Sequence, residues 1–428
     1  MEVRPGYKQT EAGLIPCDWL VRPVGIMGEV VTGKALAVNA PGEQRPYLRT
    51  KNVFDGRIDI DDVLKMPMTD AQFRQFMLKK GDVLLNEGQS LELVGRCALY
   101  QDEYPEPCAI QNQLLRFRAR QCVSGVFASH LFRHCQQTGV FARVALQTTS
   151  IAHLGGKRFE RLLLQWPSTE DEQRAIATAL SDVDALLGGL DRLIAKKRDL
   201  KQAAMQQLLT GQTRLPGFHR EWEVKRLGYL GTFLKGSGIK KDEAASGDLT
   251  CVRYGEIYTH HNDYIRSFNS WISPKIAATA TRLKHGDLLF AGSGETKEEI
   301  GKCVAFIDDC EAYAGGDIVI LRMKNVEPMF MGYYCNTPAI NIQKASLGQG
   351  DAVVHISAAA LSSVLIALPS VPEQTAIAAV LSDMDAELAS LEARRDKTRA
   401  LKQAMMQELL TGRTRLISHD ATCTEVKA

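Results

Sequence analysis

Two stretches of the chain carry the same helical pattern of apolar and polar residues. Residues 172–215 and 373–416 align without gaps at a shift of 201 residues, and 27 of the 44 aligned positions are identical. Apolar residues recur at steps of three and four, the a/d spacing of a narrow coiled-coil seam. The predicted seam consists of Ile176, Leu180, Val183, Leu187, Leu190 and Ile194 in the first stretch and Ile377, Leu381, Met384, Leu388 and Leu391 in the second. The pattern predicts two long helices that pack on each other.

Both predicted helices have start and stop signals. Residues 169–172 and 370–373 fit the Ser/Thr-x-x-Glu capping box, in which each side chain satisfies a backbone amide of the first turn. Gly211 and Gly412 follow the last periodic residues, where a left-handed residue commonly ends a helix. About 40 residues at ~1.5 Å each give rods of about 60 Å. Charged residues interrupt each seam near its middle, and we expect the seam to resume at Leu200, Met205, Leu208 and Leu209 and at Leu401, Met405, Leu409 and Leu410.

The block before each helix reads as a mixed α/β, β-rich globule. Short β-prone runs edged by Gly and Asp occur at 83–85, 114–117 and 318–321, and a helix is expected near 70–78. Shared anchors link the two blocks, such as Gly-Asp before the 83–85 run and again before residue 288. The predicted fold class is therefore α+β with an internal repeat. Two globule-plus-rod units tend towards two-fold symmetry, which would make the rods antiparallel.

The predicted domain order is globule, rod, globule, rod. The expected bounds are 1–166 and 216–368 for the globules, 167–215 and 369–416 for the helical regions, and 417–428 for a disordered C-terminal tail. The 428 residues are too many for one core. Composition is ordinary, with 45% hydrophobic and 24% charged residues and a net charge of +2. The ten cysteines show no C-x-x-C spacing and no apolar run is long enough to cross a membrane, so we expect a cytoplasmic protein without a structural zinc site or membrane association.

Catalytic motifs are weak throughout. Residues 28–35 nearly match a phosphate-binding P-loop, but Ala35 replaces the Ser or Thr that must reach magnesium. The matching 231–237 segment has no lysine at the equivalent position, so the shared glycines indicate the framework of a turn. His153, His355 and the pair at 260–261 lack triad or metal-binding context and are expected to be structural. The chain is thus predicted to have no catalytic, cofactor or metal site of its own.

Two groups of residues in each block suit contact with nucleic acid. Cationic, aromatic and amide side chains mix as they do on nucleic-acid-binding faces, and small or amide side chains on glycine-rich loops can reach phosphates or base edges. A solvated loop or strand is the alternative for each group. The candidates are Arg45, Tyr47, Arg49, Lys51, Asn52, Asn86, Gln89 and Ser90 in the first block and Arg253, Tyr254, Glu256, Ser293, Glu295, Thr296 and Lys297 in the second.

The whole chain resembles the specificity (S) subunit of type I restriction-modification enzymes. The resemblance rests on the opening Gly6-Tyr7-Lys8-Gln9-Thr10, on Pro167-Ser168 with Glu172-Gln173, on Leu208-Leu209-Thr210-Gly211, and on the second copy from Pro369 to Leu416. It implies that each globule reads one half of a bipartite, asymmetric sequence in double-stranded DNA. It also implies that the helices set the spacing and dock two methyltransferase (M) subunits, after which restriction (R) subunits join. S-adenosylmethionine, ATP and Mg²⁺ would then belong to those partners.

Other functions stay open from the sequence alone. A coiled-coil scaffold that binds proteins through its globules would show no DNA affinity, whereas a DNA reader should lose affinity steeply as salt rises. An independent nucleotide-dependent enzyme has only the incomplete P-loop in its favour. The specificity subunit of another restriction class would share the same two-domain plan.

Overall fold

The computed structural model describes residues 5–11, 13–35, 37, 39–147, 150–350 and 353–417, so the predicted disordered tail lies outside the described residues except for Ile417. The chain forms two compact units. Unit 1 comprises Met1–Asp191 and Arg394–Ala428, and unit 2 comprises Arg192–Ala393. Each unit combines helices with mostly antiparallel sheets, which confirms the α+β fold class. Among the described residues, no helix is both long and apolar enough to span a bilayer.

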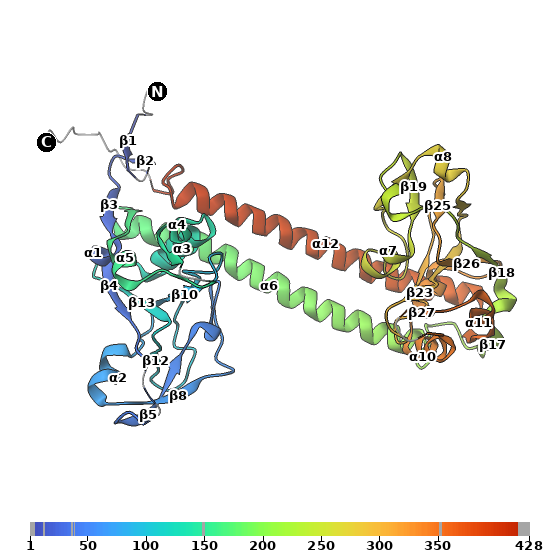
Figure 1. Ribbon diagram of the computed structural model, residues 1–428, viewed down its shortest axis with the longest axis horizontal. Coiled ribbons are helices and arrows are strands. Elements are labelled where there is room, and N and C mark those ends of the chain that lie inside the picture. Colours follow the sequence, from blue (N-terminus) through green and yellow to red (C-terminus); the bar gives the residue numbers. More distant parts are fainter. Residues whose placement is uncertain are drawn as a thin grey trace. The chain divides into compact units, whose positions relative to one another are not determined.

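The two long helices are present as predicted. Helix α6 spans Glu170–Leu208 and α12 spans Val371–Leu409, each with 39 residues and a length of about 58 Å (Figure 1). Gly211 and Gly412 both have φ of +70°, the left-handed conformation expected after a helix end. The N-terminal part of α6 and the C-terminal part of α12 belong to unit 1, and the remaining parts belong to unit 2.

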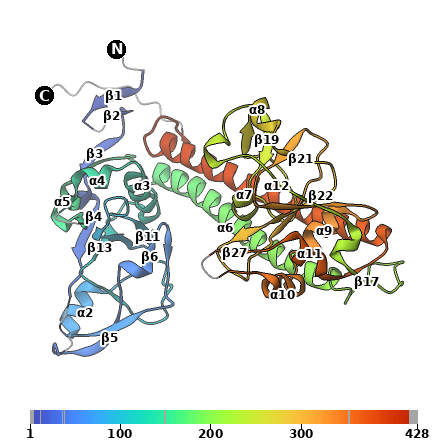
Figure 2. The ribbon, with the colours of Figure 1, turned by 45° about the vertical axis from the view of Figure 1, so that its right-hand side comes forward.

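Unit 1 is built around an antiparallel sheet with strand order β11-β9-β13-β4. A second sheet, β12-β5-β8, lies on the far side of the first from α6, with α2 beside it (Figures 1 and 2). The elements of unit 1 are β1 Tyr7–Thr10, β2 Gly13–Pro16, β3 Leu20–Pro23, α1 Val24–Met27, β4 Gly28–Thr32, β5 Glu43–Leu48, the 3₁₀ helix η1 Thr50–Asn52, β6 Val53–Phe54, β7 Arg57–Ile58, β8 Leu64–Met68, α2 Asp70–Phe76, β9 Val83–Asn86, β10 Gly88–Gln89, β11 Cys97–Leu99, β12 Ala109–Ile110, β13 Leu114–Ala119, α3 Gly125–Gln137, α4 Val140–Val144, β14 Leu146–Gln147, β15 Ala152–His153, α5 Gly156–Arg161 and β16 Leu163–Trp166.

Unit 2 repeats this plan. Its central sheet has the order β24-β22-β26-β18, and its second sheet, β20-β19-β25-β21, contains a parallel β19–β25 pair just as β5 and β12 are parallel in unit 1. The elements of unit 2 are β17 Glu223–Arg226, η2 Leu227–Leu230, β18 Gly231–Lys235, η3 Lys241–Glu243, β19 Leu249–Val252, α7 Tyr254–Thr259, β20 Ser270–Ile272, α8 Pro274–Ala277, β21 Thr281–Arg282, β22 Asp287–Ala291, β23 Ser293–Gly294, β24 Cys303–Ala305, β25 Ala312–Ala314, β26 Ile318–Met323, α9 Pro328–Tyr334, α10 Pro338–Leu347, β27 Val354–His355, α11 Ala358–Ser363 and β28 Leu365–Leu368.

The glycine pattern that resembled a P-loop starts in a strand in each unit and ends just after it, so the prediction of a turn was wrong for the first glycine of each pattern. Gly28 begins β4 and Gly231 begins β18, and both strands pair with a central strand of their sheet. Glycine is needed there because the neighbours come close. A Cβ on Gly28 would lie 2.3 Å from the ring of Phe117, and one on Gly231 would lie 2.0 Å from the carbonyl oxygen of Arg322. The glycines that the two segments share are therefore explained by close packing against neighbouring strands.

The parts of α6 and α12 that share a unit run antiparallel. In unit 1, Asp184 pairs with Lys402 and Asp191 with Arg395, so the residue number falls along α12 as it rises along α6. In unit 2, Lys197 and Lys201 of α6 pair with Glu387 and Asp385 of α12, again in falling order. The charged residues that interrupt the apolar seam thus connect the two helices.

The first predicted capping box is only half formed, and the second is not formed, because the amide of Glu373 donates to the backbone carbonyl of Ser370. The amide of Glu172 donates to the Thr169 hydroxyl at 3.4 Å, but the Glu172 carboxylate accepts from Arg415 and from the Trp19 indole. In the repeat, the carboxylate of Glu373 accepts two bonds from Arg214, both 2.6 Å long. Each first-turn glutamate is almost fully buried and anchors the end of the opposite helix in the same unit. In each case the glutamate carboxylate bonds an arginine that is distant in sequence, and not the backbone amide that a capping box would provide.

The seam does not resume at Leu200 and Leu401 as predicted, because these side chains are 47% and 56% exposed. The next residue packs inward instead, and it is buried in α12 and half-buried in α6. Lys402 is 6% exposed and donates to Asp184 at 2.6 Å, and Lys201 donates to Asp385 at the same distance. A buried lysine stem packs as an apolar group while its ammonium keeps a carboxylate partner. Of the remaining seam positions, Leu208, Leu209, Leu409 and Leu410 are buried in the unit cores.

An aspartate joins both helices to the globule in each unit; it is half-buried in unit 1 and buried in unit 2. In unit 1, Asp184 of α6 accepts from Lys402 of α12 and from Arg133 of α3. In unit 2, Asp385 of α12 accepts from Lys201 of α6, and the globule contributes the Tyr333 hydroxyl at 2.5 Å. We call these two groups the aspartate hubs of unit 1 and unit 2.

The charge of each hub aspartate is stabilised by its donors. Burial alone would raise the pKa of Asp385, but the bonds from Lys201 and Tyr333 lower it below 3.8. The pKa of Asp184 is also lowered, because Arg133 and Lys402 outweigh its burial. Both carboxylates are therefore ionised at neutral pH, and the stability that they confer is lost as the pH falls below about 3.8.

Removing a hub charge should destabilise unit 2 more than unit 1. Asp385 is 5% exposed and pairs with both Lys201 and Arg266. Asp184→Asn deprives Lys402 of its carboxylate, but the Asp184 side chain is 35% exposed and the guanidinium of Arg133 still bonds Asp55. Breaking a buried ion pair costs about 3 kcal/mol. We therefore expect amide exchange in unit 2 of Asp385→Asn to accelerate about 100-fold, measured by hydrogen–deuterium exchange mass spectrometry of peptides from each unit. Equal protection losses in the two variants would show that unit 2 does not depend more strongly on its hub.

A buried histidine should make unit 1 sensitive to mild acid. His130 of α3 is 5% exposed, and burial together with the charge of Arg133 lowers its pKa from 6.5 to about 4. Between these values only the unfolded chain binds a proton at this residue, so stability should fall as the pH drops from 6.5 towards 4, by up to about 3 kcal/mol. His130→Gln should show a smaller loss of melting temperature between about pH 7 and about pH 5 than the unaltered chain. An equal loss would exclude His130 as the cause.

Candidate nucleic-acid interface

A short strand pair holds the candidate loop of each globule. In unit 1, β10 pairs with β15 so that Gly88 faces His153, and in unit 2, β23 pairs with β27 so that Ser293 faces His355. The Nδ1 atom of His153 lies 3.0 Å from Oε2 of Glu87. The Nδ1 atom of His355 lies 2.9 Å from the Ser293 hydroxyl. Each histidine thus bonds a side chain of its own unit at the base of the loop that follows.

The loops after these strand pairs present different side chains. In unit 1, Gln89 is half-buried and Ser90 is exposed. In unit 2, Glu295, Thr296 and Lys297 are all exposed. The backbone at the start of the unit 1 loop is fixed, because the carbonyl of Ser90 accepts from the amides of Leu93 and Val94. The two loops thus offer an amide and a hydroxyl in unit 1, and a carboxylate, a hydroxyl and an ammonium in unit 2.

The basic candidates of unit 1 are paired with exposed carboxylates. Arg45 on β5 lies 3.1 Å from Asp70, and Arg49 and Lys51, beside and within η1, lie 2.6 and 2.7 Å from Asp62. The bond from Lys51 is the largest cause of the lowered pKa of Asp62, against the opposing effect of burial. Ion pairs at an exposed surface contribute little stability. These cations can therefore exchange a carboxylate for a phosphate at small cost.

Several candidates are buried, and their polar groups are used within the globule. Asn52 is 2% exposed, donates to the carbonyls of Asp59 and Asp62 and accepts from the amide of Arg49. Asn86, which is fully buried, donates to the carbonyl of Val53 and so ties the end of β9 to the residue after η1. The remaining buried candidates are Tyr47, Glu256 and Ser293. These five residues position the loops and strands around them.

The second candidate group of unit 2 is organised around Glu256 on α7. Its carboxylate accepts from the backbone amide of Arg253 at 3.0 Å, from the Arg253 guanidinium and from the Ser270 hydroxyl. Arg253 is therefore committed to this internal network. Tyr254, the next residue, is 41% exposed and directs an aromatic ring to solvent.

Sequence reasoning missed two residues that shape these loops. Glu87 is needed for the histidine contact of unit 1, and it also accepts from the amide of Gly155 at 3.2 Å. In unit 2, the hydroxyl of Tyr258 lies 2.7 Å from the position that a Cβ on Gly294 would take, so α7 touches β23. Burial raises the pKa of Tyr258 to about 12, so its hydroxyl stays protonated. The recurrence of a histidine shortly before each long helix was the signal that could have pointed to Glu87.

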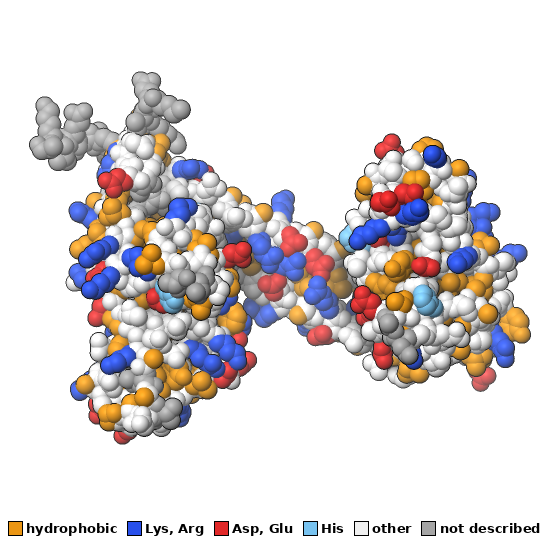
Figure 3. Space-filling model, viewed as in Figure 1, with side chains coloured by type: hydrophobic (Ala, Val, Ile, Leu, Met, Phe, Trp, Pro, Cys, Tyr) orange, Lys and Arg blue, Asp and Glu red, His pale blue; other side chains and the backbone are white. Residues whose placement is uncertain are grey.

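The arrangement suits sequence-selective contact with a polyanion. In unit 1 the structure brings η1, β9 and β10 together through Asn86, and in unit 2 it brings α7 beside β23 through Tyr258. Basic and acidic side chains are interspersed over the visible face, including the long helices (Figure 3). Selectivity would then depend on a few exposed side chains at loop positions.

Comparisons with known proteins agree on one family. Residues 219–398 match the family model described as the type I restriction modification DNA specificity domain. A putative type I restriction enzyme specificity subunit, MjaX, from Methanocaldococcus jannaschii is 25% identical, and the alignment covers 96% of this chain and 97% of that protein.

Solved structures share the fold. The S subunit of a type I restriction-modification system from M. genitalium has a TM-score of 0.57 at 16% identity, and the match covers 95% of this chain and 98% of that one. A chain from a structural study of complex assembly and conformational transition of the type I R-M system has a TM-score of 0.55 at 17% identity, covering 94% and 99%. The similarity therefore extends over both units.

Proposed function

Because this chain belongs to the specificity subunits of type I restriction-modification enzymes, we propose that its two units each read one half of a bipartite, asymmetric DNA target. The chain is a DNA-recognition subunit and not the catalytic one. The observation that carries the proposal is the repetition of one set of internal contacts around loops with different exposed side chains. Two domains that recognise different DNA sequences need a common framework and different side chains on their loops.

We propose that residues 1–166 and 216–368 are the recognition domains and that the helical regions, 167–215 and 369–416, set the distance between them. The candidate coiled-coil seam remains a proposal, with its side chains distributed between the unit cores. Ile176 and Leu180 are buried with Met406 and Leu409 in unit 1, and Ile377 and Leu381 are buried with Leu208 in unit 2. The remaining proposed seam residues are Val183, Leu187, Leu190, Met384, Leu388 and Leu391.

Partners and cofactors follow from the family. We propose that two methyltransferase subunits dock on the helical regions and that restriction subunits then join them. We also propose that the assembled complex acts on DNA in the cytoplasm. One of the solved relatives comes from a study of such complex assembly. The methylation of adenine from S-adenosylmethionine and the ATP- and Mg²⁺-dependent steps would take place on those partners. The role of this chain would be to bind and orient the DNA.

The DNA contacts that we propose are the exposed and half-buried members of the candidate set whose side chains are not committed within the globule. In unit 1 these are Gln89 and Ser90, which can pair with base edges, and Arg45, Arg49 and Lys51, which can reach phosphates. In unit 2 they are Tyr254, Glu295, Thr296 and Lys297. The buried candidates would act indirectly by fixing these loops.

The direct test is adenine-methylation mapping of DNA from cells that express this chain with its methyltransferase partner. We expect one bipartite, asymmetric methylated motif that disappears without the chain. Gln89→Ala with Ser90→Ala should relax only one half of the motif, and Glu295→Ala with Thr296→Ala should relax only the other, since each good base contact contributes ~1–3 kcal/mol of discrimination. The two double variants serve as controls for each other. An unchanged methylation pattern on removal of the chain would refute the proposal.

The spacing between the half-sites should follow the helices. One heptad inserted after Asp191 in α6 and another after Ala393 in α12 would add about 10 Å to each helix, or about three base pairs of DNA. We expect the methylated motif to keep its half-sites and to lengthen its spacer by that amount. Insertion into α6 alone is the control, because it shifts the antiparallel ion pairs out of register and should abolish methylation. A spacer that stays constant in the double insertion would show that the helices do not set the distance.

A further inference from the structure

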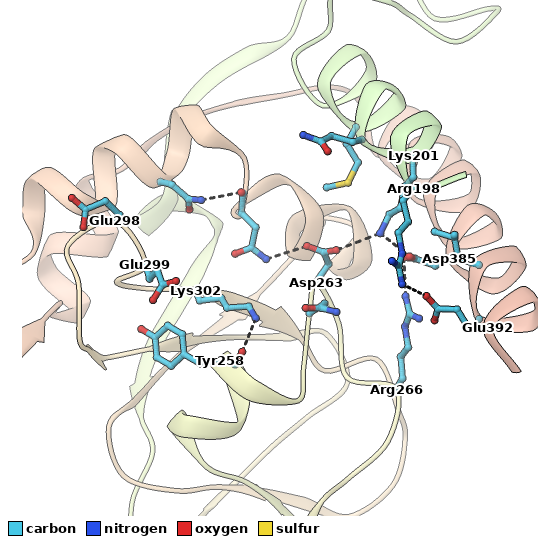
Figure 4. Close-up of a pocket in the computed structure, with 17 residues that line it drawn as sticks. Arg198, Lys201, Tyr258, Asp263, Arg266, Glu298, Glu299, Lys302, Asp385 and Glu392 are labelled. Carbon is cyan, nitrogen blue, oxygen red and sulfur yellow. Dashed lines mark hydrogen bonds and ion pairs between the residues drawn. The ribbon is translucent and has the colours of Figure 1, made fainter. Parts of the chain in front are cut away.

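Unit 2 contains a polar cavity of about 900 Å³ between its long helices and its recognition domain (Figure 4). The helices contribute Arg198 and Lys201 from α6 and Asp385 and Glu392 from α12. The recognition domain contributes the opposite wall, which includes Asp263. The cavity therefore opens at the same junction that the aspartate hub of unit 2 holds together.

The cavity is short of one positive charge. Five acidic and four basic residues line it among the described residues. Arg198 pairs with Glu392, and Lys201 and Arg266 both pair with Asp385. The acids left over are Asp263, Glu298 and Glu299, and the remaining base is Lys302, whose ammonium donates to the carbonyl of Tyr258 at 3.3 Å. Glu298 and Glu299 are exposed at the rim, without an ion pair to any described residue.

The corresponding junction of unit 1 is filled by an arginine. Ser124 caps α3 and Glu327 caps α9, and their backbone amides are bonded by the equivalent glutamines, Gln173 and Gln374. Arg133 lies nine residues after the first cap, and its guanidinium bonds Asp55 at 2.8 Å and Asp184 at 2.9 Å. One guanidinium thus bridges a carboxylate of the globule and a carboxylate of the helix.

Unit 2 has an amide where unit 1 has this guanidinium. Asn336 lies nine residues after the second cap and donates to Asp263 at 3.2 Å. The nearest ammonium, that of Lys201, is 3.8 Å from Asp263 and is already bonded to Asp385. Burial raises the pKa of Asp263, which marks a carboxylate that is poorly compensated. Asp263 therefore faces the cavity with only a distant ammonium that it shares with Asp385, whereas Asp55 of unit 1 bonds a guanidinium directly.

We propose that this cavity receives an arginine side chain of a partner polypeptide, which supplies from outside the guanidinium that Arg133 supplies within unit 1. The proposal rests on the proposed function, because partner subunits would present the arginine. A guanidinium is planar, stays charged at all relevant pH values and can bond two carboxylates at once, as Arg133 does. Asp263 at the inner wall and the glutamates at the rim provide the acceptors, and one added cation balances the lining.

The proposal can be tested on the full-length chain with N-acetyl-L-arginine amide as the probe. Met205 lines the cavity, and its equivalent, Met406, is buried in the core of unit 1, so methyl-labelled methionine provides a reporter and an internal reference for NMR. We expect the probe to shift the Met205 methyl resonance and leave that of Met406 unchanged. The uncharged isostere, N-acetyl-L-citrulline amide, should shift neither. A response to both compounds, or to neither, would overturn the proposal.

Charge reversal at the rim gives the second measurement. Glu298→Lys with Glu299→Lys should abolish the Met205 response and lower the affinity for the methyltransferase or restriction partner that supplies the arginine by at least about tenfold. Glu92→Lys is the matched control, since Glu92 lies three residues before Gly95 as Glu298 lies three before Gly301. Unchanged affinity of the double variant for both partners would overturn the inference. Methylation of the bipartite motif by that variant would show that the proposed function stands independently of it.

Discussion

The buried pairing of an aspartate on one long helix with a lysine on the other is the interaction on which both units depend. Apolar seams are non-directional and tolerate sliding, whereas a buried carboxylate that loses its ammonium is strongly destabilising. Asp184 with Lys402, and Asp385 with Lys201, therefore fix the register of the helices within each unit. Because each hub also accepts a donor from the adjacent globule, the same carboxylate connects helix pairing to domain orientation.

Much of this architecture could be predicted because the signals are local. The identity of the two helical stretches predicted a repeat, and the Gly residues at their ends predicted where α6 and α12 stop. The functions of Glu172 and Glu373 could not be predicted in the same way. Their spacing from Thr169 and Ser370 fits a local cap, but each finds an arginine that is far away in sequence. A charge-assisted bond inside a buried junction is stronger than one to a backbone amide, so tertiary structure overrides the local motif.

The sequence indicated which types of residue could form the candidate interface, but it did not indicate which of their side chains are exposed. Arg45 and Tyr47 are two residues apart, the spacing expected for side chains on one face of β5. Tyr47 is nevertheless buried, and only Arg45 is partly exposed to solvent. Asn52 and Glu256 looked like base-reading side chains, but each bonds the backbone amide three residues before it and so begins a short helix. Amide and carboxylate groups are as useful for closing a turn as for contacting a base. A single sequence contains nothing that separates the two uses.

The differences between the two hubs explain how the halves of the chain can diverge. The Asp–Lys pair between the helices is repeated at equivalent residues, whereas the donor from the globule is Arg133 in unit 1 and Tyr333 together with Arg266 in unit 2. The helix pairing therefore does not depend on which donor the globule provides. A recognition domain can change its surface, and even the way it is fastened, while the carboxylate and ammonium that set the helix register stay the same. The ion pair that fixes the helix register within each unit is physically separate from the residues that we propose to determine sequence preference.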